Sequence, residues 1–300
     1  MANANAGTGA DPRVRRALLQ IHFCVVLWGF TAILGKLISL PAFELVWWRM
    51  LLVSLAIALW PPVWRSLSRL DQGTWLRFGG AGVIVALHWL TFYGAIKLAN
   101  ASVAATCMAL CPLMMAVVEP WIARSRFDPR ELLIGLLALP GVALVVGGTP
   151  PGMRAGIVVG TVSAALVVVF GSLNKRYVER ADPLVMTWVE LGSGTAFLTV
   201  VALLLPGGGF AWPDGRDFAL LATLAIACTL LPFTLSLQAL RHTNAFTVQL
   251  AVSLEPVYAV LLAIVLLGEQ RELSVQFYLG VALIVGSVLA HTLMKLRGRA

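Results

Sequence analysis

Four ionisable side chains in this 300-residue sequence lie deep inside long apolar runs: Arg49, His88, Glu190 and Glu255. A charge at the centre of a membrane helix costs about 2.5–3.5 kcal/mol on insertion scales, so such residues usually have a function. A carboxyl group in apolar surroundings favours its neutral form, and it can bind or release a proton as its contact with water changes. We predict that Glu255 binds protons in this way, with His88 and Glu190 as lesser candidates.

A purely structural role is the alternative for these side chains. His88 fits a hydrogen-bonded structural histidine as well as a functional one. Glu255 could instead form an ion pair with Arg49, which would satisfy two costly charges at once. The sequence leaves both interpretations open, and we favour the functional one for Glu255.

The apolar run at about 245–267 contains two helical stripes that could face a cavity. At 100° per residue, Glu255 and Tyr258 share one stripe, whereas Gln249 and Ser253 face away from it. Both sets cannot fully line one cavity, and the sequence allows either. We favour Glu255 and Tyr258, because a carboxylate turned toward lipid would be the more costly arrangement.

Aromatic side chains surround His88 in the apolar run at about 77–96. Phe92 lies on the same stripe, and Trp89 and Tyr93 flank it. A polar, aromatic wall of this kind suits an amphipathic small molecule. The residues predicted to bind such a molecule are Trp28, Arg49, His88, Trp89, Phe92, Tyr93, Met108, Glu190, Glu255 and Tyr258.

Two prolines, Pro112 and Pro256, interrupt apolar runs at positions 144 residues apart. Proline lacks an N–H, so the carbonyl four residues earlier, at Met108 or Val252, loses its helical donor. Helices interrupted at matching places in two halves of a chain are the best sequence indication of a transport site. We therefore predict a functional helix break at each proline, with a simple packed kink as the structural alternative.

The composition requires a membrane around these residues. Hydrophobic residues make up 59% of the chain and charged residues 12%, and the mean hydropathy is +0.88. Soluble domains average about 25% charged residues, so a soluble fold is excluded. The predicted fold class is an all-α polytopic membrane protein with ten transmembrane helices. The corresponding apolar stretches lie at about 18–38, 43–60, 77–96, 101–121, 132–148, 155–173, 183–205, 217–239, 245–267 and 276–294.

The net charge of +8 reflects how the chain is inserted. In a soluble protein it would suggest nucleic acid as a partner, but here most Lys and Arg residues fall in connections on the side of the N-terminus. The positive-inside rule predicts a multi-pass protein of the cell (inner) membrane with both termini cytoplasmic. We expect a small-molecule substrate and the lipid bilayer as partners, and no nucleic acid.

No motif indicates a cofactor, a metal site or a catalytic site. The four cysteines lie in apolar runs as small hydrophobes, and no further ligands complete a metal site around Cys107 and Cys111. An intramembrane enzyme using His88 is a less favoured alternative. A series of small residues permits close helix contact, within the chain or in a homodimer: Gly152, Gly156, Gly160 and Ala164.

The chain repeats once, at a distance of about 144 residues. Residues 95–101, Ala-Ile-Lys-Leu-Ala-Asn-Ala, correspond to residues 239–245, Ala-Leu-Arg-His-Thr-Asn-Ala. Each half contains five predicted spans, and an odd number makes the second half enter the membrane from the opposite side. We expect a cytoplasmic tail at 1–16, a first five-helix repeat at 17–148, and an inverted second repeat with a short cytoplasmic tail at 149–300.

These features resemble the EamA-type family of the drug/metabolite transporter superfamily over nearly the whole chain. The resemblance is carried by short motifs: Trp28-Gly29, Lys36, Arg49, Tyr93-Gly94-Ala95, Pro112, Gln238-Ala239-Leu240, Glu255-Pro256 and Gly268-Glu269. It implies a two-repeat transporter with a central cavity, commonly an exporter of amino acids or related small metabolites. With Glu255 as proton acceptor, we predict a secondary active exporter that works by alternating access. An uncoupled facilitator or a channel-like protein is the alternative.

Overall fold

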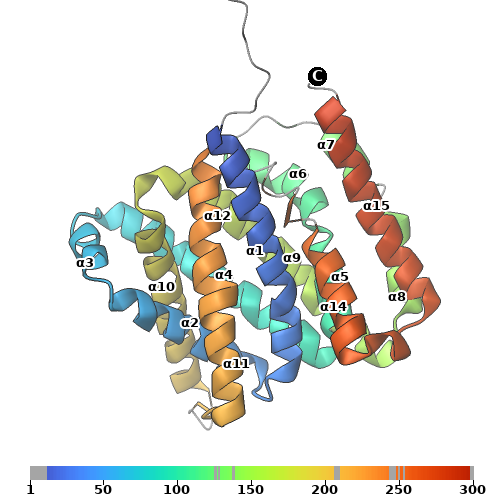
Figure 1. Cartoon of the computed structure of the whole chain (residues 1–300), viewed down its shortest axis with the longest axis horizontal. Coiled ribbons are helices and arrows are strands. Elements are labelled where there is room, and N and C mark those ends of the chain that lie inside the picture. Colours follow the sequence, from blue (N-terminus) through green and yellow to red (C-terminus); the bar gives the residue numbers. More distant parts are fainter. Residues whose placement is uncertain are drawn as a thin grey trace, which may run out of the picture.

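The computed structural model describes residues 12–124, 127, 129–136, 139–205, 210–242, 248, 251–252 and 254–297. In this part of the chain all regular structure is helical (Figure 1). The helices are α1 (Pro12–Leu37), α2 (Ala42–Ala58), α3 (Pro61–Leu67), α4 (Gln72–Leu98), α5 (Ala101–Met108), α6 (Cys111–Ile122), α7 (Pro129–Leu136), α8 (Leu139–Gly148), α9 (Arg154–Tyr177), α10 (Pro183–Leu204), α11 (Gly215–Ala225), α12 (Leu231–His242), α14 (Glu255–Leu262) and α15 (Val275–Arg297). Short 3₁₀ or π segments adjoin them at Pro151–Met153, Val178–Arg180, Ile226–Leu230, Ala263–Leu267 and Glu269–Arg271.

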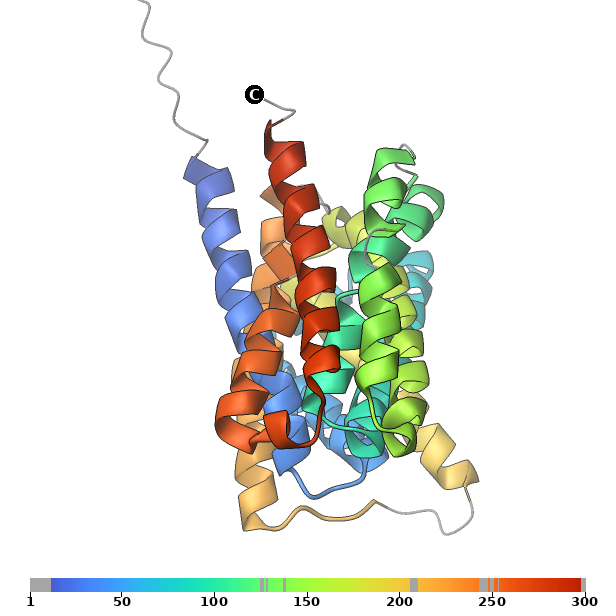
Figure 2. The ribbon, with the colours of Figure 1, turned by 90° about the vertical axis from the view of Figure 1, so that its right-hand side faces the viewer.

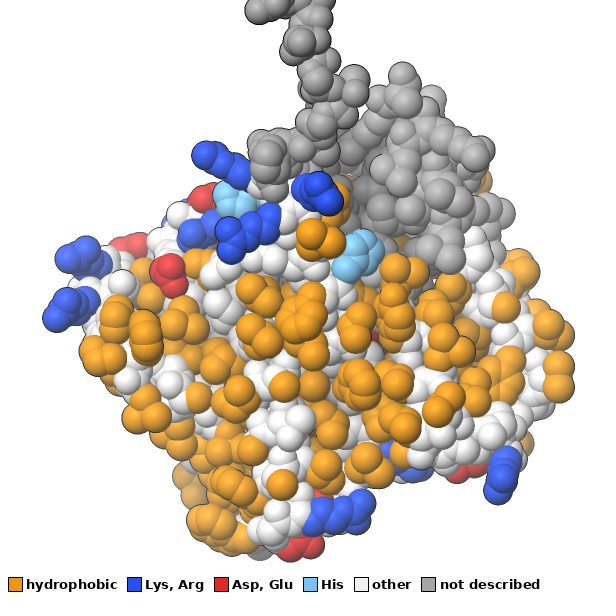
Figure 3. Space-filling model, in the orientation of Figure 1, with side chains coloured by type: hydrophobic (Ala, Val, Ile, Leu, Met, Phe, Trp, Pro, Cys, Tyr) orange, Lys and Arg blue, Asp and Glu red, His pale blue; other side chains and the backbone are white. Residues whose placement is uncertain are grey.

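In the described part of the chain, five helical stretches are long and apolar enough to cross a membrane, or up to seven if each bent pair is one span. The bent pairs are α2 with α3, at 94°, and α5 with α6, at 41°. Each of the ten predicted apolar stretches contains at least one helix, so ten spans are consistent with the structure. Hydrophobic side chains cover the middle of the face in Figure 3, and charged side chains gather toward its two ends.

Prolines explain most of the interruptions within the predicted spans. Pro112, Pro140, Pro232 and Pro256 are the second residues of α6, α8, α12 and α14. A proline in the first turn of a helix removes an N–H that has no helical partner in any case, so each proline begins a new helix at little cost.

Short polar side chains fix other helix starts. Asn100 caps α5 by accepting a hydrogen bond from the Val103 N–H at 3.0 Å. Asp71 caps α4 in the same way, and hydrogen bonds from the hydroxyl and N–H of Thr74 hold the pKa of Asp71 below its ordinary value. These caps satisfy backbone donors that a helix cannot satisfy itself.

Matching helices of the two halves run in opposite directions. In Figures 1 and 2, α1 runs away from the end of the bundle at which α15 finishes, whereas α9, the first helix of the second half, runs toward that end. The long helices α4 and α9 are antiparallel, since His88 of α4 contacts Ser163 of α9, while Ala99, just beyond α4, meets Gly156 at the start of α9. This is the inverted arrangement predicted from five spans per half.

Glycines allow several helices to approach closely. A Cβ atom built on Gly82 would lie 2.1 Å from the backbone oxygen of Glu190, so α4 and α10 touch through their backbones. Two members of the small-residue series, Gly156 and Gly160, pack against Ala99 and Cys107 of the same chain. The packing interpretation therefore accounts for these two positions, and the homodimer stays a prediction.

We predict that Gly82→Ala destabilises the protein, because the added methyl group must push α10 away from α4. Overpacking of this kind costs about 1–3 kcal/mol, and the melting temperature of the detergent-purified protein should fall. Gly80→Ala is the matched control, since a Cβ there meets nothing within 4 Å on the same helix. Equal melting temperatures for the two variants would contradict the proposed backbone contact.

Candidate functional site: a cavity between the two halves

A cavity lies between the halves, with an empty volume of about 1130 Å³ that includes the space at its open mouth. Helices α1, α2, α4, α5 and α6 of the first half and α9, α12 and α14 of the second half contribute to its walls. Its lining is mostly apolar with a few polar side chains, which is typical of a small-molecule site. Most of the residues predicted to bind one line it: Trp28, Arg49, His88, Trp89, Phe92, Met108 and Glu255.

Three predicted residues do not line this cavity. Tyr93 is fully buried behind the wall and contacts Arg49. Glu190 is fully buried on α10, and neither of its carboxyl oxygens has a hydrogen-bond partner. Tyr258 is 37% exposed, and its Cβ lies against Gly29 of α1. Glu190 was predicted from its depth in the membrane and Tyr258 from its helical stripe. The orientations of α10 and α14 direct both side chains away from this cavity.

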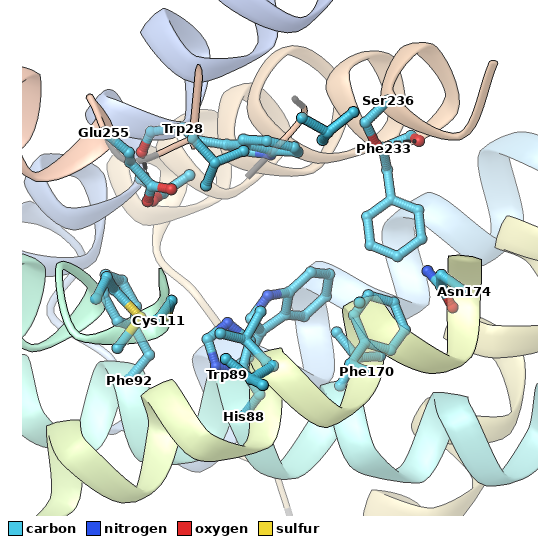
Figure 4. Close-up of a pocket in the computed structure, with 18 of the residues that line it drawn as sticks. Trp28, His88, Trp89, Phe92, Cys111, Phe170, Asn174, Phe233, Ser236 and Glu255 are labelled. Atoms are coloured by element: carbon cyan, nitrogen blue, oxygen red, sulfur yellow. Dashed lines mark hydrogen bonds between the residues drawn. The ribbon is translucent and has the colours of Figure 1, made fainter. Parts of the chain in front are cut away.

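Glu255 is the first residue of α14 and faces the cavity (Figure 4). Its carboxyl group makes no hydrogen bond with any described residue. Val248 and Val252, from the preceding turn of the chain, line the same wall. The alternative residues Gln249 and Ser253 lie outside the described part of the chain, so the comparison between the two stripes rests on Glu255 and Tyr258 alone.

The two helix breaks have the same hydrogen-bond pattern, 144 residues apart. The Leu110 N–H donates to the Cys107 carbonyl at 3.1 Å, and the Leu254 N–H donates to the Ala251 carbonyl at 3.0 Å. These three-residue bonds replace the four-residue bonds of an α-helix. The repeated sequence thus produces a repeated local structure on opposite sides of the cavity.

Each break places on the cavity wall the residue four positions before a proline. Met108 and Val252 both line the cavity. Their carbonyls have no helical donor, because Pro112 and Pro256, four residues later, lack an N–H. A carbonyl without a helical donor can accept a hydrogen bond from a ligand or water. The breaks therefore add two backbone acceptors to a wall that is otherwise largely apolar.

Arg49 is held by neutral partners and not by an acid. Its Nε donates to Thr229 Oγ1 at 2.6 Å and one terminal nitrogen donates to the Tyr93 hydroxyl at 2.8 Å. The guanidinium also stacks 3.7 Å from the centre of the Trp89 ring. Arg49 and Glu255 line one cavity without forming an ion pair with each other, so the structural pairing considered for Glu255 is not what holds Arg49 in place.

His88 is anchored to α9 through Ser163. Its Nδ1 lies 3.0 Å from the Ser163 carbonyl oxygen and 2.8 Å from the Ser163 hydroxyl, which donates to the His88 carbonyl. Because a carbonyl can only accept, we assign the proton of the neutral ring to Nδ1. The Nε2 atom is then an acceptor, on a ring that lines the cavity.

Other wall residues were not predicted from the sequence, among them Phe170, Asn174, Phe233 and Ser236. Phe170 and Asn174 are four residues apart on α9 and so share a face, as do Phe233 and Ser236 on α12. The position of the polar Asn174 beside an apolar run could have indicated a residue of the cavity wall. It was overlooked because the neighbouring Lys175 and Arg176 suggest the end of a span.

The cavity is amphipathic along its length. In Figure 4, Glu255 and Trp28 stand toward one end, Asn174 and Ser236 stand at the other beside Phe170 and Phe233, and Trp89 lies between the two ends. The rings of Phe170 and Phe233 are 5.6 Å apart. Such a site can bind a molecule with an apolar body and polar groups at its ends.

Two inverted helical halves around an amphipathic central cavity define the class as a membrane transporter. The sequence matches the EamA-like transporter family twice, at residues 15–147 and 154–293. The chain belongs to this family, which indicates a transporter and not an enzyme. The prediction of the family is confirmed.

Similar proteins cover nearly the whole chain. An uncharacterised transporter of Bacillus subtilis (strain 168) is 22% identical over 297 residues, which is 95% of this chain and 91% of the relative. Others, from Pseudomonas aeruginosa and Archaeoglobus fulgidus, are 26% and 25% identical and cover 88% and 85% of this chain, each match spanning 90% of the relative. A solved crystal structure shares the fold, with a TM-score of 0.67 at 20% identity over 95% of this chain and 99% of that one.

We predict that Arg49→Lys destabilises the protein. An ammonium group cannot reach Thr229 and Tyr93 together while stacking on Trp89, and each lost hydrogen bond to a charged group costs about 1.5–3 kcal/mol. A clear fall in melting temperature should follow. Arg216→Lys on α11 is the control and should melt like the parent, because Arg216 is exposed. A parent-like Arg49→Lys would show that the network contributes little.

Proposed function

We propose that the protein is a secondary active exporter of amino acids or related small amphipathic metabolites, and that it works by alternating access. The observation that carries this proposal is the cavity between the inverted halves, with Glu255 at a helix break on its wall. Two similar halves of opposite orientation can adopt two similar states, one open to each side of the membrane.

The lining supports an amphipathic substrate. Arg49 and Glu255 offer opposite charges in one cavity, which suits a molecule with a cationic and an anionic group, such as an amino acid. The aromatic rings of Trp28, Trp89 and Phe233 provide apolar contact for its side chain. The amide of Asn174 can bind further polar groups.

The role of Glu255 is to carry a proton. Its carboxyl group has no hydrogen-bond partner among the described residues and borders space that water can enter. A proton can therefore bind when substrate is absent and leave when a cationic group of the substrate approaches, because like charges exclude each other from one site. This competition couples proton entry to substrate exit.

The position of the cavity supports export as the direction of transport. Its wall includes Asn174 and Leu240, close to the ends of α9 and α12, and these helices finish at the same end of the bundle as α15. With both termini in the cytoplasm of the cell (inner) membrane, the cavity would receive substrate from inside the cell. Export is the corresponding direction.

The test uses protein reconstituted in liposomes with a panel of radiolabelled amino acids, preceded by thermal-stabilisation screening of amino acids, nucleobases, sugars and carboxylates. We expect saturable counterflow of one screened compound, and accumulation driven by a pH gradient. Glu255→Gln should lose the pH-driven accumulation, and its remaining counterflow should need a higher substrate concentration, because the carboxylate that faces the cationic group is gone.

The matched control is Glu190→Gln, a buried carboxyl group that does not line the cavity and should leave both measurements unchanged. A parent protein that ignores the pH gradient would be an uncoupled facilitator. Linear, non-saturable flux would indicate a channel. A chemically altered substrate recovered from the liposomes would indicate an intramembrane enzyme and would overturn the proposal.

A further inference from the structure

A buried carboxylate from the second half holds the start of α5 in the first half. Glu269 is 1% exposed. One of its oxygens accepts a hydrogen bond from the Ala101 N–H at 3.0 Å, and the other accepts one from the Ser102 N–H at 2.8 Å. A carboxylate at the positive end of a helix with two backbone donors makes a strong, charge-assisted contact.

The start of α5 depends on both halves for its hydrogen bonds. Asn100 satisfies the N–H groups of Val103 and Ala104, through its side-chain and backbone oxygens. The two remaining N–H groups, of Ala101 and Ser102, are bonded to Glu269. Without Glu269 these two donors would be buried without partners, which costs free energy.

Gly268 turns the chain so that Glu269 can enter this site. Its φ angle of 69° lies in the left-handed region, directly after the π segment that ends at Leu267. Residues with a Cβ adopt this region at a cost, whereas glycine adopts it readily. Gly268 and Glu269 therefore act together: the glycine turns the backbone, and the glutamate accepts hydrogen bonds from the start of α5.

A second carboxylate joins the halves at the same end of the bundle. Asp217 of α11 accepts hydrogen bonds from the Ser39 N–H at 3.1 Å and from the Ser39 hydroxyl at 2.6 Å. Both contacts lie at the end away from the start of α1 and the finish of α15. At its other end, α5 finishes at Met108 on the cavity wall.

We propose that the contact between Glu269 and the Ala101 and Ser102 N–H groups is a latch that keeps this end of the bundle closed. Opening the cavity toward this end requires the halves to separate here, so the latch must release in each transport cycle. Glu269 is thus a positioning residue that acts through α5. The inference rests on the proposed alternating access, but its test needs no transported substrate.

Glu269→Gln is the sharpest variant, because it preserves size. A carboxamide offers one acceptor oxygen, and its NH₂ group opposes a backbone donor, so only one of the two bonds can persist. Glu272→Gln is the matched control in the same turn. Glu272 is exposed and accepts a hydrogen bond from the Asn100 amide at 3.0 Å, which a Gln oxygen can also accept.

Two measurements test the latch in reconstituted protein. Hydrogen–deuterium exchange of a peptide covering the first turn of α5 should be several-fold faster in Glu269→Gln than in the parent or in Glu272→Gln. Labelling with a membrane-impermeant thiol reagent uses Ser102→Cys and Ser236→Cys, each in a background in which the native cysteines are replaced by alanine or serine: Cys24, Cys107, Cys111 and Cys228.

With Glu269→Gln added, labelling at Ser102→Cys should rise and labelling at Ser236→Cys should fall, because opening one end closes the other. Labelling that rises at both positions would mean general loosening, and parent-like exchange and labelling would mean no latch; either result overturns the proposal. Absence of transport for every compound, with opposite labelling changes intact, would instead count against the proposed function alone.

Discussion

A polar group inside a bilayer must find its partners within the protein, and Arg49 is where this constraint acts most strongly. The guanidinium joins α2 to Tyr93 of α4 and to Thr229 of the second half, and it stacks on Trp89. Such a group cannot be moved alone, because each partner would be left buried and unsatisfied. It therefore fixes the halves against each other beside the cavity, and motion of the halves must either carry this cluster as a unit or rearrange it completely.

The same constraint explains the π segment at Ile226–Leu230. The Thr229 hydroxyl donates to the Leu224 carbonyl, five residues earlier, at 2.6 Å and accepts from Arg49 at 2.6 Å. The wider turn presents Thr229 to the guanidinium, and the hydroxyl in turn satisfies a carbonyl that the irregular backbone would leave exposed. An irregular helix is tolerated at this depth because protein, and not lipid, surrounds it.

Hydropathy and charge were enough to predict the all-helical fold and its inverted halves, because both patterns follow directly from the bilayer. They also brought Arg49, His88 and Glu255 to one cavity, since buried ionisable groups must face protein or water. They did not predict that Tyr258 leaves the cavity wall. Both residues lie in α14, but positions three apart differ by about 60° around a helix, and this offset turns Tyr258 toward Gly29 of α1. For Glu190, the sequence indicates the depth of the side chain in the membrane but not the direction in which it faces. That direction depends on the packing of α4 against α10, which Gly82 permits.

The two ends of the bundle are not equivalent, although the halves share one fold. Among the described residues, the carboxylates that join the halves are Asp217, Glu269 and Glu272, and they lie at the end opposite the termini. At the other end, Arg241 donates to the Ala181 carbonyl within the second half. Position 125, which lies 144 residues before Glu269, is a serine, so the first half has no counterpart of this acid. In the proposed alternating access, the repeat would supply two similar states, and the connecting segments, which differ between the halves, would set the difference in free energy between them.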